Sequence, residues 1–105
     1  MTYYTYSLRC ENGSFYTGIT TDPARRFLEH SRQKSGGAKA TGISRPVCME
    51  AVWSSGSRAE ASRLEYRIKR LTHAQKRSLI DGEAPLPLEG GDHERVNVDG
   101  EGHFI

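Results

Sequence analysis

Five side chains whose combined chemistry suits phosphodiester hydrolysis occur at ordered positions along this chain. Tyr6 and Tyr16 lie ten residues apart, and Arg26 follows ten residues later. His30 comes four residues after the arginine, and Glu65 lies further along the chain. Two phenols, a guanidinium, an imidazole and one carboxylate are sufficient groups for hydrolysis assisted by one divalent metal ion. The set therefore predicts a hydrolytic site.

The chemistry gives each type of group a role. A magnesium ion held by one carboxylate keeps several waters and acts on the phosphate and the leaving oxygen. An arginine binds the non-bridging phosphate oxygens. A tyrosine has a reference pKa near 10, so ionising it near pH 7 to 8 needs roughly 3–4 kcal/mol from neighbouring positive charge. Arg26 and the metal ion are the candidates for that charge.

Each of these residues also has an ordinary structural explanation. The tyrosines fit half-buried strand positions, the arginine fits a surface or cap position, and the histidine fits a polar helix position. Glu65 has an ion-pair partner in Lys69, four residues later. However, Glu65 lies four residues after Ala61 and three before Ile68, so it borders the predicted apolar stripe of its helix. An acid in that place requires a partner, either a metal or an arginine.

The start of the chain predicts a hairpin whose register decides whether the tyrosines can meet. Alternating side chains on both sides of Asn12-Gly13 indicate strands over residues 2–10 and 14–20. A two-residue turn places the two phenols on opposite faces of the hairpin. A three-residue loop with a left-handed Gly13 pairs Tyr6 with Gly18 and places both phenols on one face. A shared site requires the three-residue loop.

A helix over residues 23–33 is predicted to carry the arginine and the histidine of the site on one face, since they are four residues apart. Asp22 is a good N-cap, and Pro23 fits the first helical position. Arg25 and Glu29 have the same spacing and are expected to form a surface ion pair.

Four further segments follow this helix. Residues 34–46 form a glycine-rich basic loop, and residues 47–53 alternate as a third strand. Capping boxes at Ser57 and Thr72 begin two helices, of which the second ends near Ile80. The predicted fold class is therefore α+β, with a small three-stranded antiparallel sheet flanked by helices in the order β-β-α-β-α-α.

Charge divides the chain into two parts. Residues 1–80 contain 14 of the 15 bases and 6 of the 13 acids, a net charge of +8, whereas residues 81–105 contain seven acids and one base. A basic body suits a polyanion such as nucleic acid, although a well-solvated surface is the alternative. We interpret residues 1–80 as the domain and residues 81–105 as a flexible acidic tail, rich in glycine and proline, that can cover the basic face.

Other classes of protein are excluded by what the sequence lacks. There is no apolar run near 18 residues and no signal peptide, so we expect a cytoplasmic protein that does not bind membranes. Cys10 and Cys48 have no metal-binding spacing and are expected to be buried free thiols. The remaining histidines share no ligand spacing with the cysteines, which argues against a zinc site.

In this order the residues resemble the GIY-YIG endonuclease superfamily, and most closely its small stand-alone bacterial members. The specific part runs from Tyr16 to His30, whereas Tyr4-Thr5-Tyr6 replaces Gly-Ile-Tyr in the first motif. The matching segments, within residues 2–80, are 4–10, 13–22, 25–30, 45–47 and 63–71.

The resemblance implies a metal-dependent endonuclease that acts on DNA. It makes Tyr6 and Tyr16 the two motif tyrosines, with Tyr6 favoured as the general base and Tyr16 bonded to the water or the phosphate. It makes Arg26 the phosphate-binding arginine and His30 an assisting polar residue. It makes Glu65 the ligand of a single Mg²⁺ or Mn²⁺.

The chain also departs from the family pattern. Many members carry an asparagine after the glutamate helix, and Asn97 is too far into the predicted tail to be assigned to it. With no separate DNA-binding domain, targeting is expected to come from DNA structure or from a protein partner. Two alternatives remain: a non-catalytic nucleic-acid-binding module, and an interaction domain whose basic face binds a partner protein.

Overall fold

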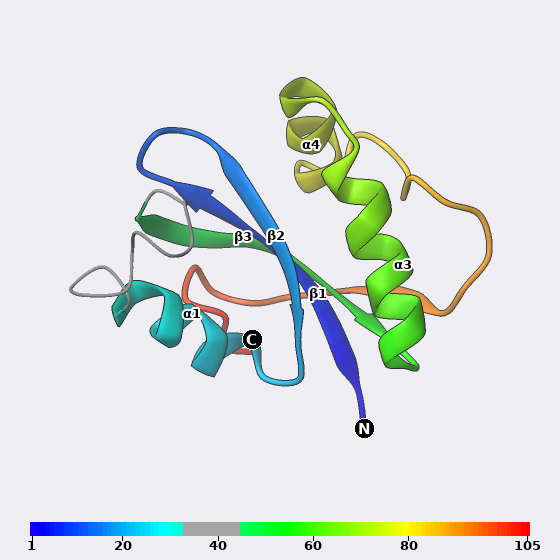
Figure 1. Cartoon of the computed structure of the whole chain (residues 1–105), viewed down its shortest axis with the longest axis horizontal. Helices are drawn as coiled ribbons and strands as arrows, with labels where there is room; N and C mark the ends of the chain where they lie inside the picture. Colours follow the sequence, from blue (N-terminus) through cyan, green and yellow to red (C-terminus); the bar gives the residue numbers. More distant parts are fainter. Residues whose placement is uncertain (33–44) are drawn as a thin grey trace.

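A four-stranded antiparallel sheet lies at the centre of the computed structural model, which describes residues 1–32 and 45–105 (Figure 1). The sheet order is β2-β1-β3-β4, with strands β1 (Tyr3–Cys10), β2 (Phe15–Thr20), β3 (Pro46–Ser55) and β4 (His93–Val96). The helices are α1 (Pro23–Arg32), α3 (Arg58–Lys69) and α4 (His73–Ile80). The α+β class is confirmed, but the prediction of three strands is wrong because β4 adds a fourth.

The β1–β2 hairpin has the three-residue loop that a shared tyrosine site requires. Gly13 has a φ of 86°, in the left-handed region that favours glycine, and its N–H donates to the Cys10 carbonyl. Tyr6 is paired with Gly18, two residues from Tyr16. Because side chains alternate along a strand, both phenols lie on the same face of the sheet.

The N-termini of the three helices have the predicted capping residues. An Asp22 carboxylate oxygen accepts the Arg25 N–H at the start of α1. The Ser57 hydroxyl accepts the Glu60 N–H at the start of α3, but the Glu60 carboxylate pairs with Arg63, so the predicted capping box at Ser57 is only half formed. Thr72 and Gln75 form a complete capping box at the start of α4. Within the described ranges, no helix is both long and apolar enough to cross a membrane.

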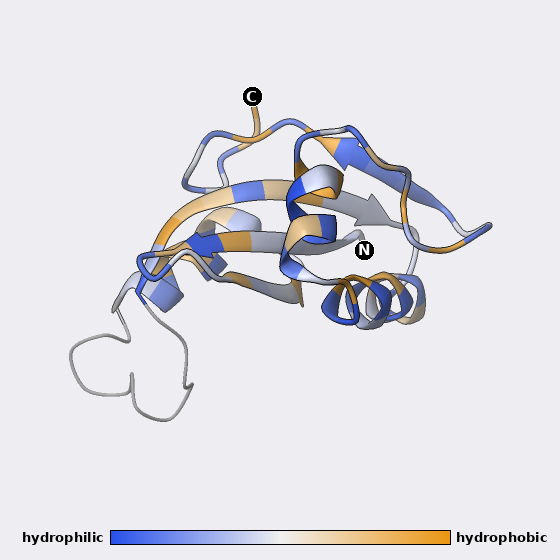
Figure 2. Ribbon diagram, turned by 90° about the horizontal axis from the view of Figure 1, so that it is seen from above, coloured by the Kyte–Doolittle hydropathy of each residue, from blue (hydrophilic) through white to orange (hydrophobic). Residues whose placement is uncertain are grey.

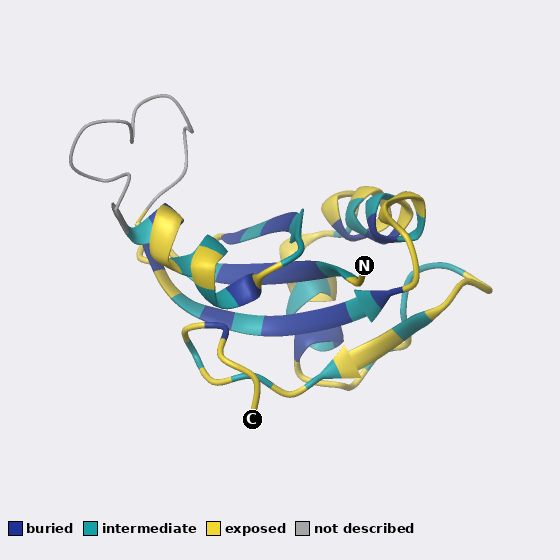
Figure 3. Cartoon of the chain, turned by 90° about the horizontal axis from the view of Figure 1, so that it is seen from below, coloured by how far each residue is buried: buried dark blue, intermediate teal, exposed yellow. Residues whose placement is uncertain are grey.

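Apolar clusters cover both faces of the sheet. Helices α3 and α4 lie against one face, where Thr5 donates a hydrogen bond to the Ala61 carbonyl and so joins β1 to α3 (Figure 1). Helix α1 lies against the other face, beside a cluster that contains Tyr6, Leu8, Met49 and Val52. Burial is therefore nearly continuous along the central strands (Figure 3).

Residues 81–105 pack along the domain, whereas their composition predicts a flexible tail. Leu86 and Leu88 pack against the α3–α4 cluster, and Val96 and Val98 pack against the cluster that contains Tyr6. Strand β4 pairs with the edge of β3. The strand is short and mainly hydrophilic, so it lacks the long alternating pattern by which strands are recognised in a sequence (Figure 2).

Polar contacts explain how so hydrophilic a strand is held. The Arg95 guanidinium lies over the Trp53 ring, 5.3 Å from its centroid, and donates to the Ile80 carbonyl over 3.1 Å. The Ser55 hydroxyl and His93 Nδ1 are 2.7 Å apart. These contacts join β4 to β3 and to the end of α4.

Two smaller predictions concern the cysteines and the basic loop. Cys10 is a buried free thiol, and Cys48 is also free but only partly buried. The glycine-rich basic loop predicted over residues 34–46 lies outside the described residues, except for its last two positions.

Candidate active site

Tyr6 lies at the centre of the candidate site, where its phenol passes over Gly18 of β2. The residue is completely buried, with 0% of its surface exposed. A Cβ atom at position 18 would lie 2.6 Å from the phenol oxygen, which is closer than real Cβ contacts. Only glycine therefore leaves space for this phenol, and the hairpin register fixes its position.

Helix α1 brings Arg26 and His30 to this phenol on successive turns. Arg26 Nε donates to the Tyr6 oxygen over 3.4 Å, and the Tyr6 oxygen lies 2.9 Å from His30 Nε2. His30 is buried, whereas the Arg26 side chain is 42% exposed. The arginine can therefore contact an incoming ligand while the imidazole is held behind the phenol.

Tyr16 completes an aromatic group around the same point. Its ring centroid lies 6.4 Å from that of Tyr6 and 5.2 Å from that of His30, with the imidazole at a steep angle to the ring. Tyr16 is partly exposed, unlike Tyr6. Four of the five predicted site residues thus meet on the α1 side of the sheet.

The protonation state of Tyr6 follows from its surroundings. Burial raises the pKa of Tyr6 to about 12, since a phenolate is poorly solvated there. The hydrogen bond from Arg26 lowers this pKa, and electrostatic interactions with Tyr16 and Glu65 have smaller raising effects. At neutral pH the phenol is therefore protonated.

Glu65 lies on α3, which contacts β1 and β2 from the other face of the sheet. Its carboxylate forms an ion pair with Lys69 over 3.2 Å, as the spacing predicts, and its side chain is 24% exposed. Among the described residues it makes no hydrogen bond to the other four. Its charge acts on the Tyr6 phenol, so the carboxylate lies within electrostatic range of the site.

A comparison with known families covers the part of the chain that carries the candidate site. Residues 2–78 match the family model described as the GIY-YIG catalytic domain. This chain belongs to the GIY-YIG family. The matched range includes the hairpin, helix α1 and Glu65, and it ends within α4.

This GIY-YIG domain is similar to several proteins named UPF0213. One from Cronobacter sakazakii is 48% identical over 81 residues, covering 77% of this chain and 83% of that protein. One from Halalkalibacterium halodurans is 40% identical over 96 residues, covering 91% and 94%. The solution NMR structure of a UPF0213 protein from Bacillus halodurans matches with a TM-score of 0.50 and 36% identity, over 79% of this chain and 86% of that one.

His30 has an unusual environment in this GIY-YIG domain. Burial lowers its pKa, and the positive charge of Arg26 lowers it further, while Glu29 raises it. The imidazole is therefore neutral at pH 7. Its Nε2 faces the Tyr6 oxygen, and its Nδ1 is buried without a hydrogen-bond partner among the described residues. A neutral ring with its proton on Nδ1 can accept the phenolic proton at Nε2.

The structure corrects one predicted ion pair next to the site. Glu29 pairs with Arg26 over 3.1 Å, at a spacing of three residues, and the predicted partner was Arg25. Both spacings are compatible with a helix, so the sequence alone does not choose between them. The consequence is that the candidate phosphate-binding arginine already has a carboxylate partner, at an exposed position.

Proposed function

We propose that this GIY-YIG domain is a metal-dependent endonuclease that hydrolyses DNA phosphodiester bonds. The observation that carries the proposal is the hydrogen-bonded group of Arg26, Tyr6 and His30, with Tyr16 beside it. It combines a cation that can bind a phosphate with two groups that can exchange a proton. The net charge of +8 over residues 1–80 supports a polyanionic substrate.

Arg26 is the proposed ligand of the scissile phosphate. Its ion pair with Glu29 is exposed on both sides and therefore weak. A phosphate that accepts the guanidinium N–H groups draws the arginine away from Tyr6. Because Tyr6 is completely buried, the proposal requires this movement of Arg26 to admit water to the phenol.

Tyr6 is the proposed general base, and His30 accepts the proton that the phenol gives up. With a pKa of about 12, ionising the phenol at pH 8 costs about 5.5 kcal/mol, at about 1.4 kcal/mol per unit. Transfer of the phenolic proton to His30 Nε2, as Tyr6 takes a proton from water, avoids a free phenolate. Tyr16 is partly exposed and can hold the attacking water or a phosphate oxygen.

Glu65 is the proposed ligand of one Mg²⁺ or Mn²⁺. The described residues contain no group of three His, Cys, Asp or Glu side chains suited to a metal. A site with a single carboxylate fits a hard cation, because such an ion keeps several waters and binds substrate oxygens. When bound, such an ion supplies positive charge to the phosphate and to the leaving oxygen. Glu65 must exchange its ion pair with Lys69, whose side chain is 53% exposed, for the cation.

A cleavage panel tests the proposal. The purified protein is incubated with duplex, flap, junction and single-stranded DNA in Mg²⁺, Mn²⁺ or EDTA. We expect metal-dependent cleavage that falls about 100-fold or more in Tyr6→Phe, Arg26→Ala and Glu65→Gln while DNA binding is kept. Tyr3→Phe, on the same strand but on the sheet face that α3 covers, is the matched control and is expected to retain activity.

The same panel separates the alternatives. Salt-sensitive binding without cleavage by the wild type would favour a non-catalytic nucleic-acid module, an outcome for which the complete burial of Tyr6 is the structural argument. No salt-sensitive DNA affinity would favour a domain that binds a protein partner. Full activity of Glu65→Gln would refute the metal assignment.

A further inference from the structure

The outer face of α3 carries an exposed aromatic side chain among arginines. Tyr66 is 59% exposed. The Arg70 guanidinium lies 5.4 Å from the centroid of the Tyr66 ring, and Arg70 donates to the Tyr66 hydroxyl over 3.3 Å. The ring is thereby oriented by a cation rather than packed against apolar neighbours, so its free face remains available to a planar ligand.

The helix geometry places this aromatic next to the candidate metal ligand. Leu64 and Ile68 face the sheet and are completely or almost completely buried. At about 100° per residue, Glu65 lies on one flank of the helix and Tyr66 points almost directly away from the sheet. A ligand that reaches Glu65 therefore meets Tyr66 as soon as it passes over α3.

A basic groove follows on the opposite flank of the same helix. It is lined by Arg63, Arg67 and residues 85–89, with a volume of about 700 Å³. Arg63 pairs with Glu60 over 3.0 Å, whereas Arg67 makes no side-chain hydrogen bond or ion pair with the described residues. Glu89 is the one acid among the lining residues.

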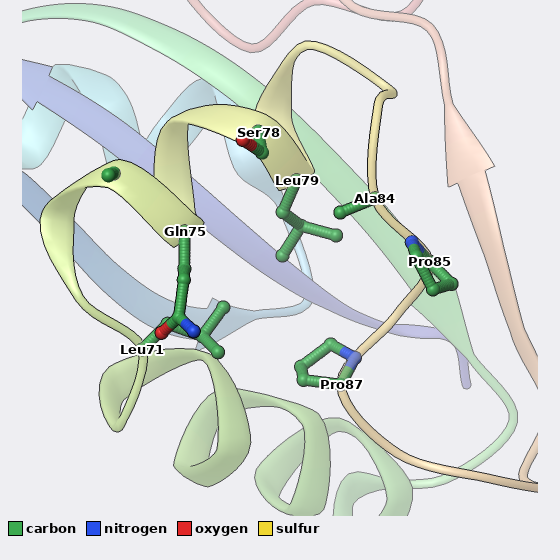
Figure 4. A pocket seen from close by; sticks show the side chains of 8 residues that line it. Leu71, Gln75, Ser78, Leu79, Ala84, Pro85 and Pro87 are labelled. Atoms are coloured by element: carbon green, nitrogen blue, oxygen red, sulfur yellow. The ribbon is translucent and has the colours of Figure 1, made fainter.

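The groove continues into an apolar hollow. Pro85 and Pro87 line both the basic groove and a second pocket against α4, where Leu71 and Leu79 supply apolar walls (Figure 4). Apolar and proline surfaces next to arginines suit a ligand that alternates charged and planar apolar parts. An unpaired nucleic-acid strand has this alternation, because its phosphates and its bases lie side by side.

We propose that the outer face of α3 binds an unpaired stretch of nucleic acid next to the scissile phosphate, with Tyr66 as the residue on which a base stacks. Arg67 and Arg63 then hold the phosphates that follow. A fully paired duplex cannot stack a base on Tyr66, since its bases are already stacked on each other. The proposal rests on the proposed function only in taking the substrate at the candidate site to be a nucleic-acid strand.

Binding without catalysis tests this surface. Fluorescence anisotropy measures the affinity of the full chain, in EDTA and at low salt, for a labelled twelve-nucleotide thymidine strand, an abasic strand of equal length and a duplex. We expect Tyr66→Ala to weaken binding of the thymidine strand about 10-fold and to change binding of the abasic strand and of the duplex less than about twofold. Tyr66→Phe keeps the ring and is expected to retain binding.

The controls separate stacking from general effects. Phe104→Ala removes an aromatic of similar exposure, 56%, on the C-terminal segment, and is expected to bind like the wild type. Arg67→Ala is expected to reduce the slope of log affinity against log salt by about 0.7 for the unpaired strand.

Several results would refute the proposal that this surface binds an unpaired strand. They are unchanged affinity in Tyr66→Ala, an equal loss for the abasic strand, or absence of binding by the wild type. The binding assay contains no metal and does not depend on cleavage. If the wild type failed to cleave DNA in the cleavage panel, the nuclease proposal would be refuted, but the binding result could still be interpreted.

Discussion

Replacing Gly18 by alanine is a direct test of whether the position of the Tyr6 phenol controls activity. The added Cβ would lie 2.6 Å from the phenol oxygen and 2.8 Å from the adjacent ring carbon, whereas ordinary contacts begin at 3.4 Å. The phenol must therefore move by about 0.8 Å. It cannot move freely, because Tyr6 is completely buried and His30 lies 2.9 Å from its oxygen.

Two magnitudes follow from that displacement. Crowding a buried site of this kind costs about 1–3 kcal/mol of stability. For a domain of this size, each kcal/mol lowers the melting temperature by about 5 °C. The activity loss should be larger, because a misplacement of about 1 Å costs roughly 100-fold in rate when reacting groups must be aligned. We therefore expect Gly18→Ala to remain folded at 25 °C and to cleave DNA about 100-fold more slowly.

Gly56→Ala is the matched control for this variant. Its added Cβ would approach the Asp92 carboxylate, 2.9 Å away, but Asp92 is an exposed side chain that can move aside. Thermal melting and cleavage rates are measured for both variants at a temperature where both are folded. If Gly18→Ala cleaved DNA at the wild-type rate, the argument that the buried phenol takes part in the chemistry would be refuted, even if the melting temperature of the variant fell.

Three further predictions concern stability. The pKa of His30 is lowered in the folded state, so the protein should lose stability as the pH falls below about 6.5. In urea denaturation, the free energy of unfolding should fall more between pH 7.5 and pH 5.5 for the wild type than for His30→Gln. An equal fall in both proteins would contradict the assignment. Arg95→Ala should lower the free energy of unfolding by about 1–2 kcal/mol, whereas Arg58→Ala, at an exposed position, should change it little. Deleting residues 92–105 should lower the free energy of unfolding by about 3 kcal/mol, mainly because the half-buried valines of that segment are lost. If the deletion left stability unchanged and only raised DNA affinity, the segment would behave as the detached tail that its composition predicts.

The sequence determines much of the hairpin and the helix starts because their signals are local. A left-handed glycine in the turn gives one of two registers, and the requirement that both phenols share a face selects the register with Gly18 under Tyr6. The caps at Ser57 and Thr72 are read from adjacent residues. The positions of the tyrosines on the hairpin and the start of α3 can therefore be predicted from local sequence alone.

The rest depends on contacts that no local pattern records. Strand β4 is stabilised by Arg95 over Trp53 and by His93 against Ser55, pairs separated by about 40 residues. The acidic and glycine-rich sequence around β4 predicts a solvated segment. The segment is ordered because of its tertiary contacts, which the composition does not reveal. The choice of Arg26 over Arg25 as the partner of Glu29 is likewise a matter of side-chain packing.

The placement of β4 at the far edge of the sheet has a consequence for biosynthesis. Every residue of the candidate site precedes position 66, so the ribosome has produced the whole catalytic group before it adds residues 93–96. Until then β3 is an uncovered edge, and such edges pair readily with other chains. A prematurely terminated chain that lacks residues 93–96 would thus carry the catalytic group and still be prone to self-association through the unpaired edge of β3.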